Sequence, residues 1–178
     1  MPLSLEQVDA FWKEGYLVMD DALSPEQLLG LRAQFAEWVE ESRTHSGSFG
    51  QTIDGRPRFD LASDHSAERP ALRRISSPAE VSDIYADAMR DNRALDALTQ
   101  IFGSNIKLNN TKVNSKLPGT ATEVKYHQDF LFEPHSNYDL AACLFFLDDV
   151  DEDNGPLEVV PGTHTGPLFE LWHDGVFT

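Results

Sequence analysis

The tripeptide His127-Gln128-Asp129 places an imidazole and a carboxylate two positions apart. On a β-strand, residues i and i+2 point to the same face, so both side chains could converge on one divalent metal ion. A histidine and a carboxylate are two of the three ligands in the facial triad that holds Fe(II) in non-haem oxygenases. The tripeptide alone is common, and a pair of structural polar side chains is the alternative interpretation. The surrounding elements must decide between the two.

A cluster of lysines lies just before this tripeptide. Four of the five lysines of the chain fall in one short interval, at Lys107, Lys112, Lys116 and Lys125. In a chain of net charge -16, this local cationic patch could receive an anionic substrate or cosubstrate. The alternative is that the lysines solvate an edge strand.

Length and composition favour one domain over residues 1–178, with enough chain to bury a core. The acidic balance argues against nucleic acid or an anionic membrane surface as a general partner. No apolar run approaches the length of a membrane span. The single cysteine, Cys143, excludes an internal disulfide, and the polar segment after Met1 is not typical of a signal peptide. We therefore expect a cytoplasmic protein, and the oligomeric state stays open.

The first half of the chain has helical patterns. Ser4 and Gln7 have capping-box spacing and predict a helix over residues 4–14 that ends at Gly15. Ser24-Pro25 begins a second amphipathic helix that runs to about Glu41. Two further helices are expected over residues 77–89 and 92–102. Between them, residues 44–74 have loop composition, with short strands expected near Phe59, Leu61 and Ile75.

The second half of the chain changes to strand patterns. Alternating apolar residues or short apolar runs predict strands at 16–19, 106–113, 124–130, 140–147 and 157–160, of which 140–147 reads as buried on both faces. Residues after His164 show no clear period. Helices followed by closely spaced strands predict an α+β, mainly β domain, in which an antiparallel sheet or sandwich is flanked by N-terminal helices.

Several of these motifs together resemble the phytanoyl-CoA dioxygenase family of Fe(II)/2-oxoglutarate-dependent oxygenases. The matching motifs cover most of the chain: Phe11-Trp12-Lys13-Glu14-Gly15-Tyr16, Leu23-Ser24-Pro25-Glu26-Gln27, Lys116-Leu117-Pro118-Gly119, His127-Gln128-Asp129, Asp153-Asn154-Gly155-Pro156 and Pro161-Gly162-Thr163-His164. The resemblance implies a double-stranded β-helix (a cupin-like jelly roll) with flanking helices.

The resemblance also implies a site. His127 and Asp129 would be iron ligands, and Lys112, Asn114 and Phe145 would line the pocket of the cosubstrate 2-oxoglutarate. The expected reaction is hydroxylation of a small organic or acyl substrate by O2, with release of succinate and CO2. The carboxylate of Asp129 favours hydroxylation over halogenation, because a small residue there would leave room for a halide.

The chain departs from the family pattern after the Pro161-Gly162-Thr163-His164 bend. In the family, a distal histidine completes the triad and an arginine pairs with the 2-oxoglutarate carboxylate, and neither is found before Thr178. We therefore expect an incomplete barrel, weaker Fe(II) affinity than that of a full triad, and no succinate from the chain by itself. A truncated, inactive family member and a jelly-roll binding module without redox chemistry stay open as alternatives.

Overall fold

The first two helices begin where their capping residues predict. The computed structural model describes residues 2–118 and 124–177, and it places α1 at Leu5–Glu14 and α2 at Pro25–Ser42. In α1, the Ser4 hydroxyl accepts the Gln7 backbone N–H at 3.2 Å, and the Gln7 side chain accepts the Ser4 N–H at 2.9 Å. Ser24 and Gln27 repeat this capping box at the start of α2. Both predicted helices are confirmed.

The next helical region begins later than predicted. Ser77 has φ 50°, a left-handed conformation that does not cap a helix, and a 3-10 turn, η1 (Pro78–Glu80), follows it. Helix α3 (Asp83–Arg90) is capped instead by Ser82. Helix α4 (Arg93–Phe102) is close to its predicted range and is capped by Asn92. The Asn92 side chain also donates to the Ala88 carbonyl at 2.7 Å, so it joins the end of α3 to the start of α4.

Residues 44–74, expected to be mostly loop with short strands, contain most of the main sheet, so the loop part of that prediction was wrong. Its strands, β1 (Phe49–Gln51), β2 (Pro57–Leu61) and β3 (Leu72–Ser76), pair antiparallel in the order β1-β2-β3-β4, where β4 is Lys112–Asn114. The strands predicted near Phe59, Leu61 and Ile75 are confirmed. Ile75 pairs with Val113, which sets the register of β4. Because the strands are short and the turns between them are polar, the composition of this region did not predict a sheet.

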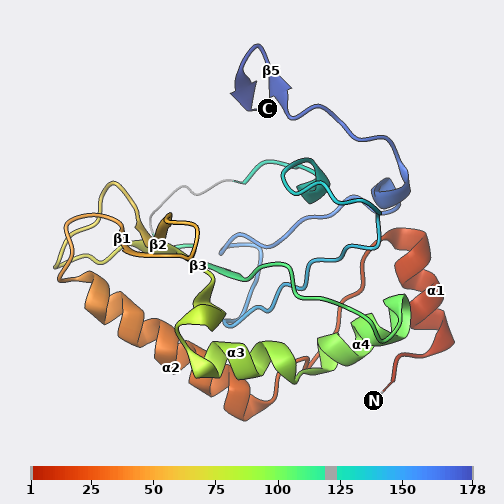
Figure 1. Cartoon of the computed structure of the whole chain (residues 1–178), viewed down its shortest axis with the longest axis horizontal. Helices are drawn as coiled ribbons and strands as arrows, with labels where there is room; N and C mark the ends of the chain where they lie inside the picture. The colour runs from red at the N-terminus through yellow and green to blue at the C-terminus, as the bar shows by residue number, and fades with distance from the viewer. Residues whose placement is uncertain (1, 119–123, 178) are drawn as a thin grey trace.

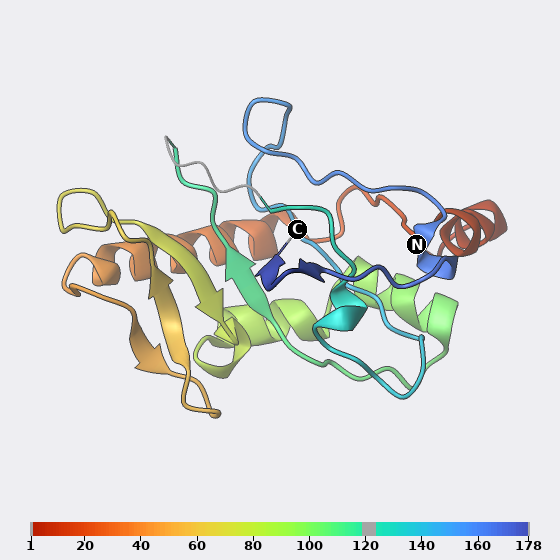
Figure 2. The ribbon, with the colours of Figure 1, turned by 90° about the horizontal axis from the view of Figure 1, so that it is seen from above.

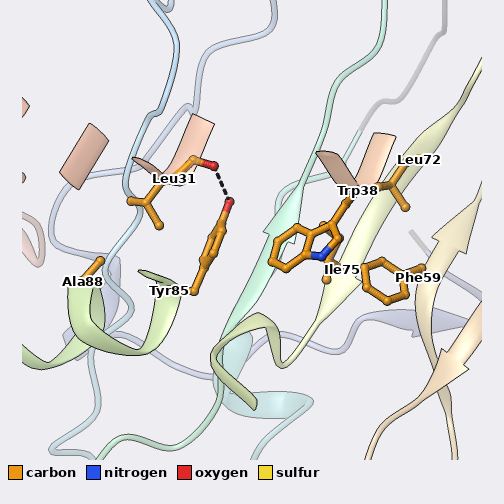
Figure 3. Close-up of a cluster of buried hydrophobic side chains, with 7 residues drawn as sticks. All are labelled: Leu31, Trp38, Phe59, Leu72, Ile75, Tyr85 and Ala88. Atoms are coloured by element: carbon orange, nitrogen blue, oxygen red, sulfur yellow. Dashed lines mark hydrogen bonds between the residues drawn. The ribbon is translucent and has the colours of Figure 1, made fainter. Parts of the chain in front are cut away.

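One face of this sheet packs on helices α2 and α3, as Figure 2 shows from above. The buried cluster is drawn in Figure 3 and consists of Leu31, Trp38, Phe59, Leu72, Ile75, Tyr85 and Ala88. Trp38 lies at its centre, with its ring 5.8 Å from Phe59 and 5.1 Å from Tyr85. Burial of these large apolar side chains is the main stabilising contribution to this half of the molecule.

The later half of the chain runs mainly as extended backbone that crosses the molecule in Figure 1. The strands predicted at 16–19, 124–130, 140–147 and 157–160 are wrong, and of 106–113 only the end forms part of β4. An apolar run of strand length becomes a strand only when a neighbour accepts its ladder of hydrogen bonds, and these segments have no such neighbour in the described part of the chain. The 140–147 run is accordingly not buried, and Leu144 is 56% exposed.

The C-terminal segment ends in a small hairpin at the opposite side of the molecule from the helices (Figure 1). Strands β5 (Trp172–His173) and β6 (Val176–Phe177) pair antiparallel across Asp174 and Gly175, which have φ of 50° and 77°. Two central residues with positive φ define the Asp-Gly turn typical of tight hairpins. The sequence prediction gave this region no structure, although the Asp-Gly dipeptide was a usable signal.

The architecture is thus mixed α+β, with an antiparallel four-stranded sheet and helices α1–α4. No helix in the described ranges is long and apolar enough to span a bilayer.

Candidate metal centre

The side chains of His127 and Asp129 meet at the surface of the extended half of the chain. His127 Nε2 lies 3.0 Å from Asp129 Oδ1. His127 and Gln128 are extended, and Asp129 begins a 3-10 turn, η2 (Asp129–Leu131), rather than continuing a strand. The predicted strand is therefore absent here, but the two side chains still converge because the extended backbone holds residues i and i+2 on one side.

The imidazole of His127 is held by three contacts. Its Nδ1 lies 2.7 Å from the Lys125 carbonyl oxygen. A carbonyl only accepts, so Nδ1 is the donor in this hydrogen bond and Nε2 is the nitrogen directed at Asp129. The ring of Phe132 packs edge-on against the imidazole at 5.7 Å. Hydrogen bonding of the distal ring nitrogen to a backbone carbonyl is the usual support of a metal-binding histidine.

The separation of the two donor atoms fits one bound ion. Two ligands about 2.1 Å from a metal and at right angles to each other lie roughly 3.0 Å apart. Over residues 2–118 and 124–177, no group of three or more His, Cys, Asp or Glu side chains is placed to hold a metal. The described residues thus offer two donor atoms at this separation, and their role as metal ligands stays a prediction.

The downstream histidines are used elsewhere. His135 Nδ1 lies 2.6 Å from the Glu133 carbonyl, and His173 pairs with the adjacent Asp174 at 3.6 Å. His164 lies in the 3-10 turn η3 (Thr163–Thr165), with its Nε2 3.0 Å from the Trp12 carbonyl near the end of α1. None of these three side chains joins the His127–Asp129 pair in the described structure.

The three residues predicted for the cosubstrate pocket lie on two segments. Lys112 and Asn114 are exposed and share one face of β4, while Val113 between them packs on the core. Asn114 Oδ1 accepts from Arg74 Nε at 3.2 Å across the β3–β4 pair. Phe145 is half-buried in the extended 140–147 segment. Their role in binding 2-oxoglutarate stays a prediction.

Residues flanking the metal pair were missed by sequence reasoning. Tyr126 donates its hydroxyl to the Glu158 carboxylate, and this hydrogen bond is the main cause that raises the pKa of Tyr126. Gln128 bonds the backbone of Pro167 and Phe169. The only indication of these contacts in the sequence was the alternation of side-chain directions along extended backbone. Side chains on either side of a predicted ligand point away from it and are free to bond other segments.

The lysine of the Lys116-Leu117-Pro118-Gly119 motif supports a turn and does not project freely. Lys116 Nζ donates to the Gly155 carbonyl at 2.5 Å. A Cβ on Gly155 would lie 2.6 Å from this nitrogen, and the glycine also has φ 80°. Two motifs that are distant in sequence therefore meet, and the positive φ at the contact favours glycine.

Comparison with known proteins gives the family of this chain. The phytanoyl-CoA dioxygenase (PhyH) family model matches residues 11–175, and the chain belongs to that family.

The chain is also similar to curated members with different substrates. It is 30% identical over 165 residues to a probable alpha-ketoglutarate-dependent hypophosphite dioxygenase of Stutzerimonas stutzeri, covering 93% of this chain and 55% of that protein. It is 26% identical to an ectoine dioxygenase of Bordetella bronchiseptica, covering 91% and 50% respectively. An L-proline trans-4-hydroxylase of Streptomyces griseoviridis is 27% identical, with 96% and 60% covered. The chain thus spans about half the length of the curated relatives it matches.

Proposed function

We propose that the protein is an Fe(II)/2-oxoglutarate-dependent dioxygenase that hydroxylates a small organic or acyl substrate. The main observation behind the proposal is that, in a chain of this family, His127 Nε2 and Asp129 Oδ1 lie 3.0 Å apart while the other ring nitrogen bonds the Lys125 carbonyl. The reaction would consume the substrate, 2-oxoglutarate and O2, and would release the hydroxylated product, succinate and CO2.

Each residue of the pair has a defined task in this proposal. His127 would bind iron through Nε2 while its Nδ1–H stays on the Lys125 carbonyl, so the imidazole remains neutral and fixed. Asp129 would bind through a carboxylate oxygen and fill the position that a halide would otherwise take. When bound, the metal with its cosubstrate supplies the oxidising power for C–H hydroxylation.

The proposal places 2-oxoglutarate near β4. Lys112 carries a positive charge on the exposed face of this edge strand and could pair with a carboxylate, and Asn114 offers an amide on the same face. Phe145 would provide an apolar wall. We also propose the jelly roll that is usual in this family as the fold around the site.

The relatives support a small-molecule substrate. By name, they act on hypophosphite, ectoine and L-proline, which share small size and polarity and little else. The substrate of this protein is accordingly proposed only as a class.

Anaerobic titration with Fe(II) tests the metal site. We expect His127→Ala and Asp129→Ala each to weaken binding by about tenfold or more, because each removes one of two paired donors. His135→Ala is the matched control, since it removes an exposed histidine close in sequence and should leave affinity unchanged. Paramagnetic Mn(II) provides a second readout, because it should broaden the amide resonances of residues 125–132 selectively.

Metal affinity that is the same in the wild type, His127→Ala and Asp129→Ala would refute the proposed site. A chain that binds no metal at these residues would instead be a binding module in which the pair is structural. For the cosubstrate, 2-oxoglutarate should bind the metal-loaded chain more tightly than the metal-free chain, and Lys112→Ala should weaken that binding.

A further inference from the structure

Side chains alternate in role along residues 126–129. The odd-numbered residues, His127 and Asp129, face each other as the donor pair. The even-numbered residues, Tyr126 and Gln128, bond distant parts of the chain instead. This alternation follows from extended backbone, in which successive side chains point to opposite sides.

Gln128 makes a reciprocal pair of hydrogen bonds with backbone far along the chain. Its Nε2 donates to the Pro167 carbonyl at 3.1 Å, and its Oε1 accepts the Phe169 N–H at 2.8 Å. The amide therefore engages the backbone on both sides of residue 168, as a neighbouring strand would. Both bonds use groups that a shorter or apolar side chain could not supply.

The segment that Gln128 contacts is itself anchored to α1. The Gly162 N–H donates to the Glu14 carbonyl at 2.7 Å, and His164 Nε2 bonds the Trp12 carbonyl at 3.0 Å. Both carbonyls belong to the last turn of α1, whose carbonyls have no partner within the helix. Residues 162–169 are therefore bonded to α1 at one end and to Gln128 at the other.

We propose that Gln128 is a positioning residue for the metal pair, a role that rests on the proposed function. The segment around residues 124–128 forms no ladder in the described structure, so its side-chain bonds must fix the backbone between the two ligands. A change in the backbone torsion angles between the two ligands would turn one ligand away from the other. By holding the peptide units on either side of it, Gln128 keeps both donor atoms on one side and lowers the cost of ordering them when the metal binds.

The Gln128→Met variant tests this role, because methionine has similar length and cannot form either bond. Gln100 is a matched control: its side-chain amide makes the same reciprocal pair with the Leu3 backbone, at 2.8 and 2.9 Å, on α4. Gln100→Met therefore loses equivalent hydrogen bonds at a place that does not contact the pair. We expect about tenfold weaker Fe(II) binding in Gln128→Met and less than about a twofold change in Gln100→Met, although both lose stability.

A second pair of variants reaches the same bond from the other side. Phe169→Pro removes the N–H that Gln128 accepts, whereas Phe169→Ala removes the ring and retains the N–H. Metal affinity should fall in the proline variant and stay near the wild-type value in the alanine variant. The two Phe169 variants leave residues 124–132 unaltered, so they test the positioning role even if Gln128→Met does not fold.

The outcomes separate the two proposals. If the wild type binds Fe(II) through His127 and Asp129 while Gln128→Met and Phe169→Pro bind equally well, the positioning role is refuted and the proposed function stands. If His127→Ala and Asp129→Ala bind as the wild type does, the proposed function itself fails.

Discussion

A single buried phenol links helices α2 and α3. Tyr85 is 4% exposed, and its hydroxyl donates to the Leu31 carbonyl at 3.2 Å (Figure 3). Burial raises the pKa of Tyr85 from 10.0 to about 12, because the phenolate would lose its hydration inside the core. The neutral phenol is therefore part of what holds the folded state together.

This phenol should make the protein sensitive to alkali. Below pH 10 the hydroxyl is protonated in both states, and its contribution to stability is complete. Between pH 10 and about 12 the unfolded chain loses the proton while the folded chain keeps it, so the free energy of unfolding falls by up to about 1.4 kcal/mol per pH unit. Urea unfolding at pH 8 to 12 measures this fall.

Tyr85→Phe provides the control for that titration. This substitution should lower the free energy of unfolding by about 1 kcal/mol at neutral pH. The Leu31 carbonyl loses the hydrogen bond from the Tyr85 hydroxyl but keeps its partner within α2. The alkaline fall in stability should be smaller in the variant than in the wild type. Equal falls in both proteins would show that other groups cause the alkaline unfolding.

Among the elements, helix α1 ends at a contact that only glycine permits. Gly15 has φ 85°, and a Cβ there would lie 2.3 Å from His164 Nδ1. The Pro161-Gly162-Thr163-His164 bend therefore serves as the C-terminal cap of α1, and it bonds two carbonyls of the last helical turn. This role accounts for a motif that the sequence could describe only as a bend.

We expect Gly15→Ala to destabilise the protein by roughly 2 kcal/mol, from backbone strain and from displacement of His164. His164→Ala removes the obstructing ring, so the double variant should recover the part of the cost due to the clash and retain the strain. A double-mutant cycle of unfolding free energies measures this coupling. Strict additivity of the two substitutions would contradict the contact.

A buried arginine joins three strands and the turn after them. Arg58 is 5% exposed and donates to the carbonyls of Gln51, Ser76 and Ser77 at 2.7–3.0 Å, and to Glu80 Oε2 at 2.6 Å. It therefore stabilises the left-handed Ser77, whose N–H in turn bonds the Thr111 carbonyl next to β4.

Arg58→Met should cost about 3 kcal/mol, because three backbone carbonyls and one carboxylate lose their common buried donor. Glu80→Gln should cost only about 1 kcal/mol, since Arg58 keeps its carbonyl partners and the Glu80 side chain is already 34% exposed. Chemical denaturation of both variants tests whether Arg58→Met lowers the free energy of unfolding more than Glu80→Gln does. If Glu80→Gln were the more destabilising change, the ion pair would matter more than the carbonyl contacts.

Elements with local signals could be predicted from the sequence, and elements that depend on distant partners could not. Ser4, Ser24 and Asn92 begin their helices through bonds to residues three positions on, so neighbouring residues suffice to identify them. The apolar run at 140–147 has strand composition, but a strand also needs a paired neighbour, and the run itself does not encode one. The contact between His127 and Asp129 could be predicted because it needs only local backbone, and its role as a metal site stays a prediction, whereas the contacts of Gln128 were missed because its partners lie about forty residues away.

At the scale of the whole molecule, the two halves are stabilised differently. The helices and the four-stranded sheet surround a buried cluster, whereas the extended later half is held by side-chain contacts such as the ion pair of Arg32 with Asp148, at 3.4 Å. That half exposes large apolar side chains on several segments, including Leu144, Phe146, Leu157 and Val160, each more than half exposed. Exposed apolar side chains in this number favour association between chains, and the net charge of -16 opposes it.

Self-association should therefore increase with salt, because screening removes the repulsion and leaves the apolar attraction. Leu144→Glu and Phe146→Glu should reduce it, and both should leave the free energy of unfolding within about 0.5 kcal/mol, since neither side chain is buried. Ile53→Glu is the matched control: Ile53 is 91% exposed in the β1–β2 turn, so the same charge is added away from the apolar segments. Sedimentation velocity at low and high salt measures the effect, and an equal response of all three variants would attribute the association to net charge alone.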